Sequence, residues 1–161
     1  IKDSQEYIHK SLLFDQERLQ EIQSLAQSGR VAPVNFGGHI FQGEDGDWQI
    51  YSLTLMTNNE TQLVGDIWPG YYMRVEGSLL EDGKILAKRI QIQQFLVRGI
   101  VESLTSERLV VGGIEILLTP DTLLQGEIGI GARVDILTLL AGENLYRARL
   151  IKVIRSDVAL P

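Results

Sequence analysis

A stretch of about 57 residues occurs twice in this chain, and the second copy lies 61 positions after the first over most of its length. Gly38 of the first copy thus corresponds to Gly99 of the second. The segment Arg74-Val75-Glu76 instead matches Arg133-Val134-Asp135 at an offset of 59, which predicts two residues lost before one strand and regained in the next hairpin. Because loops tolerate length changes that strands do not, this pattern indicates a duplicated β unit. Two copies are too few for a solenoid.

Each copy has the sequence pattern of about five short strands joined by tight turns. The expected strands lie near 36–42, 47–56, 60–64, 71–79 and 84–92 in the first copy, and near 95–103, 107–118, 121–125, 132–140 and 145–154 in the second. This is the size of an OB-like small barrel, which closes its sheet and so avoids exposed edges. We therefore expect a mainly β fold with two five-stranded OB-like barrels, at 36–92 and 95–155, or else one sandwich or barrel made by both copies.

Residues 1–30 are the only segment with helical periodicity, and they predict an amphipathic helix before the two barrels. Asp3 and Glu6 match a capping box at its start, and Gly29 is a natural C-terminal stop. Asp15 interrupts the apolar stripe, so a break into two helices near Phe14 and Asp15 is an open alternative. The stripe needs an apolar partner, which is either the first barrel or another chain or domain; its candidate contact residues are Ile8, Leu12, Leu19 and Ile22.

Charge and composition exclude several classes of function. The chain has a formal net charge of -6, and residues 36–92 contain 8 acidic against 4 basic side chains. Nucleic acid is therefore not an expected partner, because its binding depends largely on neutralising phosphates. The absence of cysteine excludes a disulfide framework and thiolate chemistry. No apolar run approaches the roughly 20 residues that cross a bilayer.

The sequence shows no pattern typical of a catalytic, metal or cofactor site. The two histidines, His9 and His39, have no ligand spacing and no accompanying carboxylate cluster. An acidic loop at Glu44, Asp45 and Asp47 lacks the ligand spacing of a calcium loop, so we interpret it as a solvated hairpin. We expect a protein that is not an enzyme and has no catalytic residues, metal or cofactor.

The two copies differ most in their aromatic residues, because seven of the eleven aromatic side chains lie in the first copy. Where that copy has Tyr51 and Trp68, the second has glycine. Aromatic side chains supply much of the energy of binding surfaces. Trp68, Tyr71 and Tyr72 are therefore candidate ligand-binding residues. For Trp48 and Tyr51 we favour packing against the helix, with a partner surface as the alternative.

The motifs of the two copies resemble a bacterial family of small all-β repeats of unknown function, found mainly in exported or membrane-attached proteins. The resemblance spans roughly residues 36–155 and rests on Val111-Gly112-Gly113-Ile114 and Thr119-Pro120-Asp121-Thr122 in the second copy. In the first copy it rests on Asp82-Gly83 and Ala87-Lys88-Arg89-Ile90. Residues 15–22 are similar to the helical segment that precedes such repeats in membrane-anchored anti-sigma factors.

The resemblance implies a non-catalytic, extracytoplasmic domain of a regulatory (anti-sigma-like) protein or of a surface protein. Such a domain would be tethered to the membrane by a segment outside this chain. It would act through contacts with a protein partner or through self-association. The alternative is a module that binds an oligosaccharide or peptide across the aromatic face of the first copy, as OB-like barrels use a strand face.

Overall fold

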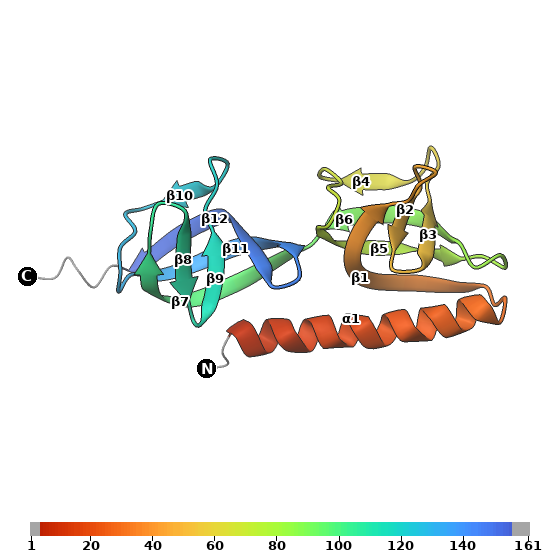
Figure 1. Cartoon of the computed structure of the whole chain (residues 1–161), viewed down its shortest axis with the longest axis horizontal. Coiled ribbons are helices and arrows are strands. Elements are labelled where there is room, and N and C mark those ends of the chain that lie inside the picture. Colours follow the sequence, from red (N-terminus) through yellow and green to blue (C-terminus); the bar gives the residue numbers. More distant parts are fainter. Residues whose placement is uncertain (1–3, 156–161) are drawn as a thin grey trace, which may run out of the picture. The chain divides into compact units, whose positions relative to one another are not determined.

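The structure, a computed structural model, describes residues 4–155. These residues form two compact units, one made of residues 11–93 and the other of residues 4–10 together with 94–155. Each unit contains one copy of the repeat, which we call the first repeat and the second repeat (Figure 1).

The described residues contain one helix and twelve strands. The helix is α1 (Ser4–Gln27), and the first repeat contains β1 (Ala32–Gln42), β2 (Trp48–Ile50), β3 (Leu53–Met56), β4 (Gln62–Val64), β5 (Tyr72–Leu79) and β6 (Ile85–Ile92). The second repeat contains β7 (Gln94–Leu104), β8 (Arg108–Val111), β9 (Ile114–Leu117), β10 (Leu123–Gln125), β11 (Arg133–Gly142) and β12 (Leu145–Arg155).

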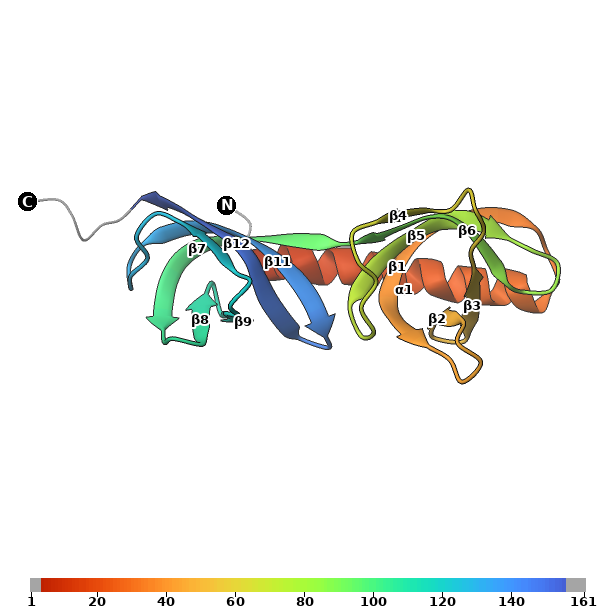
Figure 2. The same ribbon diagram turned by 90° about the horizontal axis from the view of Figure 1, so that it is seen from above.

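Each repeat closes into a small barrel of its own. In the first repeat the strand order is β3-β2-β1-β5-β6-β4, and a parallel pairing of β3 with β6 closes a ring of five strands, with β4 added to β6. The second repeat forms the same ring from β7, β8, β9, β12 and β11, with β10 added to β12 (Figure 2). This confirms the prediction of two five-stranded OB-like barrels, and the alternative of one fused barrel is wrong.

The apolar cores lie inside the rings, as strand alternation requires. Along β1, Val34, Phe36 and Ile40 are buried, whereas Asn35 and Phe41 are exposed. The second repeat buries the equivalent set on its own strands, and its largest fully buried side chains include Val97, Leu109, Ile116 and Ile136.

The segments expected as one strand each, near 47–56 and near 107–118, are both two strands with a tight turn between them. Tyr51 and Ser52 form the turn between β2 and β3, and Tyr51 has a φ of 53°. The equivalent turn of the second repeat is Gly112-Gly113, with φ values of 57° and 78°. Such tight hairpin turns need positive φ angles, which glycine adopts freely and tyrosine does not. The glycine signal was therefore present in the second copy alone.

The 61-residue offset holds through the strands, and the predicted slip at Arg74 is wrong. Gly38 pairs with Met73, and Gly99 pairs with Val134, so both partners keep the same spacing. Arg74 is therefore equivalent to Asp135 rather than to Arg133. The segments Arg74-Val75-Glu76 and Arg133-Val134-Asp135 are similar in sequence but are not equivalent in the strand register.

In both repeats one threonine, in the loop before β4 or β10, forms a hydrogen bond to a carbonyl near the beginning of β6 or β12. The Thr61 hydroxyl donates to the carbonyl oxygen of Ala87 at 2.6 Å and accepts from the Asn58 amide at 2.9 Å. Thr122 makes the same contacts to Ala148 at 2.6 Å and to the Thr119 amide at 3.0 Å. This explains why threonine occurs at both positions of the duplicated sequence.

Helix α1 is continuous, so the break considered near Phe14 and Asp15 does not occur. It ends in a Schellman motif, in which the Arg30 amide donates to the Leu25 carbonyl and the Gly29 amide to the Ala26 carbonyl. Gly29 has a φ of 69°, which confirms its predicted role as the helix stop. Asp3, the first member of the expected capping box, lies outside the described residues.

The threonine contacts predict equal effects in the two repeats. Thr61→Val and Thr122→Val should each destabilise their own unit by about 1–2 kcal/mol, because a buried carbonyl loses its donor. Trp48 and Trp68 both lie in the first repeat, so tryptophan fluorescence in urea reports Thr61→Val, and circular dichroism reports both variants. Thr57→Val, at an exposed position, is the control. An effect in one repeat alone would contradict the shared role.

Candidate functional site

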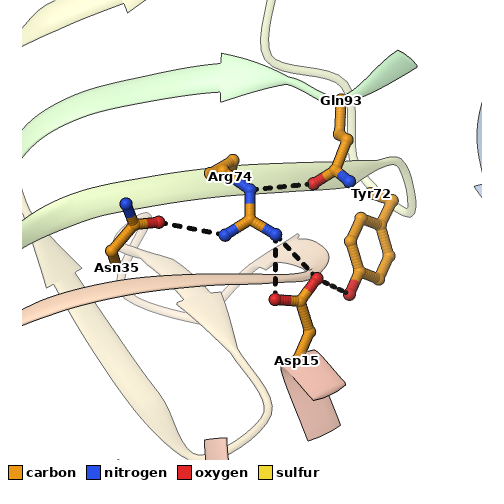
Figure 3. A network of polar contacts seen from close by, with 5 residues as sticks. All are labelled: Asp15, Asn35, Tyr72, Arg74 and Gln93. Carbon is orange, nitrogen blue, oxygen red and sulfur yellow. Dashed lines mark hydrogen bonds and ion pairs between the residues drawn. The ribbon is translucent and has the colours of Figure 1, made fainter. Parts of the chain in front are cut away.

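A buried carboxylate joins α1 to the first barrel (Figure 3). The Asp15 side chain is 2% exposed and accepts from one Arg74 Nη at 2.8 Å on each of its oxygens. One of these oxygens also accepts from the Tyr72 hydroxyl at 2.8 Å. Arg74 in turn donates to the side-chain oxygens of Asn35 at 3.0 Å and Gln93 at 3.1 Å. The buried carboxylate is thus ion-paired and hydrogen-bonded by residues of its own unit, which offsets the cost of burying its charge.

The close approach of the helix to β1 depends on Gly37. A Cβ placed on Gly37 would lie 2.6 Å from Cε1 of Tyr72 and 2.7 Å from Oδ2 of Asp15. Both distances are shorter than side-chain contacts allow, so the position must lack a side chain. Gly37 faces Arg74 across the β1–β5 ladder, which places the arginine directly beside this opening.

Tyr72 belongs to the helix contact rather than to an open surface. Burial raises the pKa of the Tyr72 phenol above its ordinary value, and its hydrogen bond to the Asp15 carboxylate raises that pKa further. The phenol therefore stays protonated and donates to Asp15. Tyr72 also contacts His39, whose ring lies edge-on at a centroid distance of 5.1 Å. The Nδ1 atom of His39 donates to the carbonyl oxygen of Gly70 at 2.9 Å.

The second repeat has a different ion pair at the positions equivalent to Gly37 and Arg74. Arg98 occupies the position of Gly37, and Asp135 occupies that of Arg74. They form a cross-strand ion pair, with Nε and Oδ1 separated by 3.3 Å. The second barrel thus supplies both charges from its own strands, whereas the first barrel takes its carboxylate from α1.

Trp68 and Tyr71 lie in the turn before β5. Both are half-buried, and their rings meet edge-on at a centroid distance of 5.0 Å. The backbone of this turn is held by a bond from the Gly70 amide to the Ile40 carbonyl, and the second repeat has the same bond from Gly131 to Val101. Trp68, Tyr71 and Tyr72 therefore do not form one exposed aromatic face.

The helix residues proposed for packing or partner contact lie mostly in the interior. Ile8, Leu19 and Ile22 are buried, and Leu12 is half-buried. Leu19 and Ile22 belong to the unit of the first repeat and Ile8 to the unit of the second. Nothing in this stripe forms an open apolar surface on the described helix.

Trp48 and Tyr51 are placed differently from each other. Trp48 is half-buried in β2, opposite the buried Leu55 of β3. Tyr51 is 61% exposed at the tip of the β2–β3 hairpin, so most of its side chain is open to solvent rather than packed on the helix. The neighbouring Ser52 does contact the helix, because Gln23 donates to its hydroxyl at 3.1 Å.

Three exposed apolar side chains of the first repeat lie on β1, on β3 and in the turn between β2 and β3. Phe41 and Met56 are 54% and 39% exposed, and the ladder and strand alternation place both on the outer side of the barrel. We call Phe41, Tyr51 and Met56 the exposed apolar face. Phe41 and Met56 were not among the residues predicted from the sequence, although the strand alternation around them indicates that they point outward.

No group of three or more histidine, aspartate or glutamate side chains is arranged for metal binding among residues 4–155. Within the same range, α1 is not apolar enough to cross a membrane.

Both repeats match one family. Residues 38–91 and 98–152 each match the family described as Domain of unknown function (DUF5666). The chain belongs to the DUF5666 family. It carries two tandem copies, and each match lies within one of the two barrels.

The DUF5666 chain also has a distant structural likeness. It is similar to the solved chain "drosophila Unr CSD456", with 14% sequence identity and a TM-score of 0.28, over 82% of this chain and 66% of that chain. The strand order, rather than this likeness, is the basis for the fold assignment. Comparison with curated proteins gives no match.

The Asp15 contacts predict a large effect of one substitution. Asp15→Ala should lower the free energy of unfolding of the first-repeat unit by about 3 kcal/mol, because Arg74 and Tyr72 lose their common acceptor in a buried site. Urea unfolding followed by tryptophan fluorescence measures this change. Gln16→Ala, next to Asp15 but exposed, is the matched control. Equal unfolding midpoints for the two variants would contradict this role of Asp15.

Proposed function

We propose that this DUF5666 chain is a non-catalytic module that binds a protein partner through the exposed apolar face of its first repeat. The main support for the proposal is the exposure and the backbone conformation of Tyr51. This residue is 61% exposed and holds a φ of 53°, at a turn position where the second repeat has Gly112.

A tyrosine at positive φ has an energetic cost that a glycine avoids. The left-handed conformation costs an ordinary residue about 1–2 kcal/mol. The exposed ring of Tyr51 recovers little of this cost by burial. Strained residues that persist at exposed positions are concentrated at sites of function. Binding of a partner would bury the ring and give it the contacts that the free protein lacks.

The surroundings of the face favour a partner with apolar and basic groups. The loop between β1 and β2 begins two residues after Phe41 and contains Glu44, Asp45 and Asp47, all exposed. Acidic groups at the rim of an apolar surface favour a partner of the opposite charge and repel phosphates. A basic, apolar segment of a protein therefore fits this surface, and nucleic acid does not.

The proposed setting is a bacterial, extracytoplasmic, membrane-attached regulatory protein of the anti-sigma type, or a surface protein. The support is the resemblance of residues 15–22 to the helix that precedes such repeats in anti-sigma factors. In this structure Asp15, Leu19 and Ile22 are used inside the first-repeat unit. In the proposed setting, this helix keeps the first barrel anchored to the preceding chain and leaves the exposed apolar face free for the partner.

Selection from a random peptide library tests the binding face. Peptides enriched on the DUF5666 chain should combine aromatic or aliphatic residues with lysine or arginine, and salt should weaken their binding. Tyr51→Gly should abolish this binding while the barrel stays folded, because the second repeat folds with glycine at that position. Fluorescence anisotropy of a labelled peptide measures the affinity.

The matched control is Leu63→Ser, which removes an exposed apolar side chain of the same repeat on β4, outside the exposed apolar face. Peptides that bind the wild type and Tyr51→Gly equally, or that bind Leu63→Ser no better than Tyr51→Gly, would contradict the assignment of this face.

The proposed location has its own test. In intact cells that express the full-length natural protein, an added protease should digest the barrels, whereas a cytoplasmic marker stays whole. Immunoblotting of the membrane and soluble fractions shows the attachment. Protection of the barrels until the cytoplasmic membrane is broken would contradict an extracytoplasmic location, and recovery in the soluble fraction would contradict membrane attachment.

A further inference from the structure

The first repeat contains a polar groove outside the exposed apolar face. It has a volume of about 540 Å³ and is lined by residues of β1, β5 and β6 and of the loop before β4. A volume of this order accommodates a small-molecule ligand. Its apolar lining includes Val34, Leu86 and Ala87, and its polar groups come from Asn35, Asn58, Glu60, Glu76, Ser78 and Lys88.

Gly77 is one of the residues that line the groove, and the equivalent residue of the second repeat has a different role. There the residue is Thr138, which is fully buried and donates from its hydroxyl to the carbonyl of Phe95 at 2.8 Å. Gly77 pairs with Val34 in the same register, but it has no side chain to donate to that strand. A Cβ on Gly77 would lie 2.2 Å from the carbonyl oxygen of Leu86, so the local backbone of the first repeat requires glycine.

A β-bulge shapes the same part of the groove. Glu76 pairs with Arg89 and Gly77 with Ala87, which leaves Lys88 as the extra residue of β6. Bulges bend a strand, redirect its side chains and are frequent beside binding sites. Here the bulge places Lys88 among the lining residues.

Hydrogen bonds within the repeat orient both amides of the groove as donors. The oxygen of Asn35 accepts from Arg74, and the oxygen of Asn58 accepts from the amide of Glu60 at 2.9 Å. Each side chain therefore has its NH₂ group for other contacts. Glu60 and Glu76 provide acceptors, so the lining contains both donors and acceptors.

The second repeat has leucines where the first has much of this polar set. Asn35, Glu76 and Ser78 correspond to Leu96, Leu137 and Leu139. Leu139 is buried, whereas Ser78 is exposed. The duplicated scaffold thus folds with leucine at these positions, so the fold does not require the polar residues of the groove.

We propose that this groove binds a neutral polyhydroxylated ligand of the size of a mono- or disaccharide. Sugar hydroxyls both donate and accept, so they match amide NH₂ groups beside carboxylates, and the apolar floor suits the C–H face of a sugar ring. The ligand hydroxyls accept from the Asn35 and Asn58 NH₂ groups and donate to the Glu60 and Glu76 carboxylates. Two carboxylates and one ammonium group give the lining a formal charge of −1, so a strongly cationic or anionic ligand fits less well. This site is independent of the protein-contact face.

A titration followed by ¹H–¹⁵N NMR tests the proposal, because the side-chain NH₂ groups of Asn35 and Asn58 give their own signals. The probes are glucose, N-acetylglucosamine, cellobiose and chitobiose, with trilysine and inorganic phosphate for comparison. At least one sugar should shift both NH₂ signals in a saturable way. Shifts with trilysine or phosphate alone, or no saturable shift with any probe, would overturn the assignment.

Two variants graft the residues of the second repeat into the groove. Glu76→Leu and Ser78→Leu should each weaken sugar binding by at least about tenfold, because one removes an acceptor and both fill space. Gln62→Leu introduces the residue of the second repeat on the exposed β4, outside the groove, and should leave the affinity unchanged. The backbone spectrum of each variant shows whether it is folded. Equal affinity of a folded Glu76→Leu variant would overturn the proposed site.

Discussion

The contact between the Asp15 carboxylate and the Arg74–Tyr72 pair is the interaction on which the structure of the first-repeat unit depends. A charge buried in the middle of an apolar helix stripe would destabilise the unit without compensation. Here the compensation comes from a guanidinium group and a phenol on β5, and the backbone at Gly37 leaves the space for it. The same contact holds Tyr72 and Arg74 against the helix, so neither of these side chains belongs to the proposed protein-contact face.

The two repeats have kept one scaffold and have diverged at the positions that carry polarity and aromatic area. The rings, the threonine contacts at Thr61 and Thr122, and the 61-residue register are shared. The differences include the Gly37 opening, the Tyr51 turn and the lining of the polar groove beside Gly77. At these places the second repeat has an ion pair within its own strands, a glycine turn and leucine side chains, respectively. The first repeat is therefore the one for which binding functions are proposed.

The sequence was sufficient for the duplication, the OB-like class and the helix stop at Gly29, because repeats, strand alternation and glycine at a helix end are local patterns. It was insufficient wherever a local pattern depended on a distant partner. Asp15 interrupts the apolar stripe of the helix, and its ion-pair partner Arg74 could not be predicted because it lies 59 residues later in the sequence. The turn at Tyr51 has no glycine to indicate it, whereas the turn at Gly112-Gly113 does, although the segment near 107–118 was also predicted as one strand. The groove could not be anticipated, since Gly77 and Thr138 become equivalent only when the strands are in register.

Hydrogen exchange of individual amides in the wild-type protein tests the central claim most directly. If Asp15 secures α1 to the first barrel, the amides of residues 16–27, apart from the frayed last turn, should be protected to a similar degree as those of β5, because they open only with the unit. Arg74→Ala should then speed exchange in the helix far more than in the second repeat. Fast exchange throughout residues 16–27 of the wild type, beside a well-protected β5, would show that the helix is not held in this way and would contradict the account.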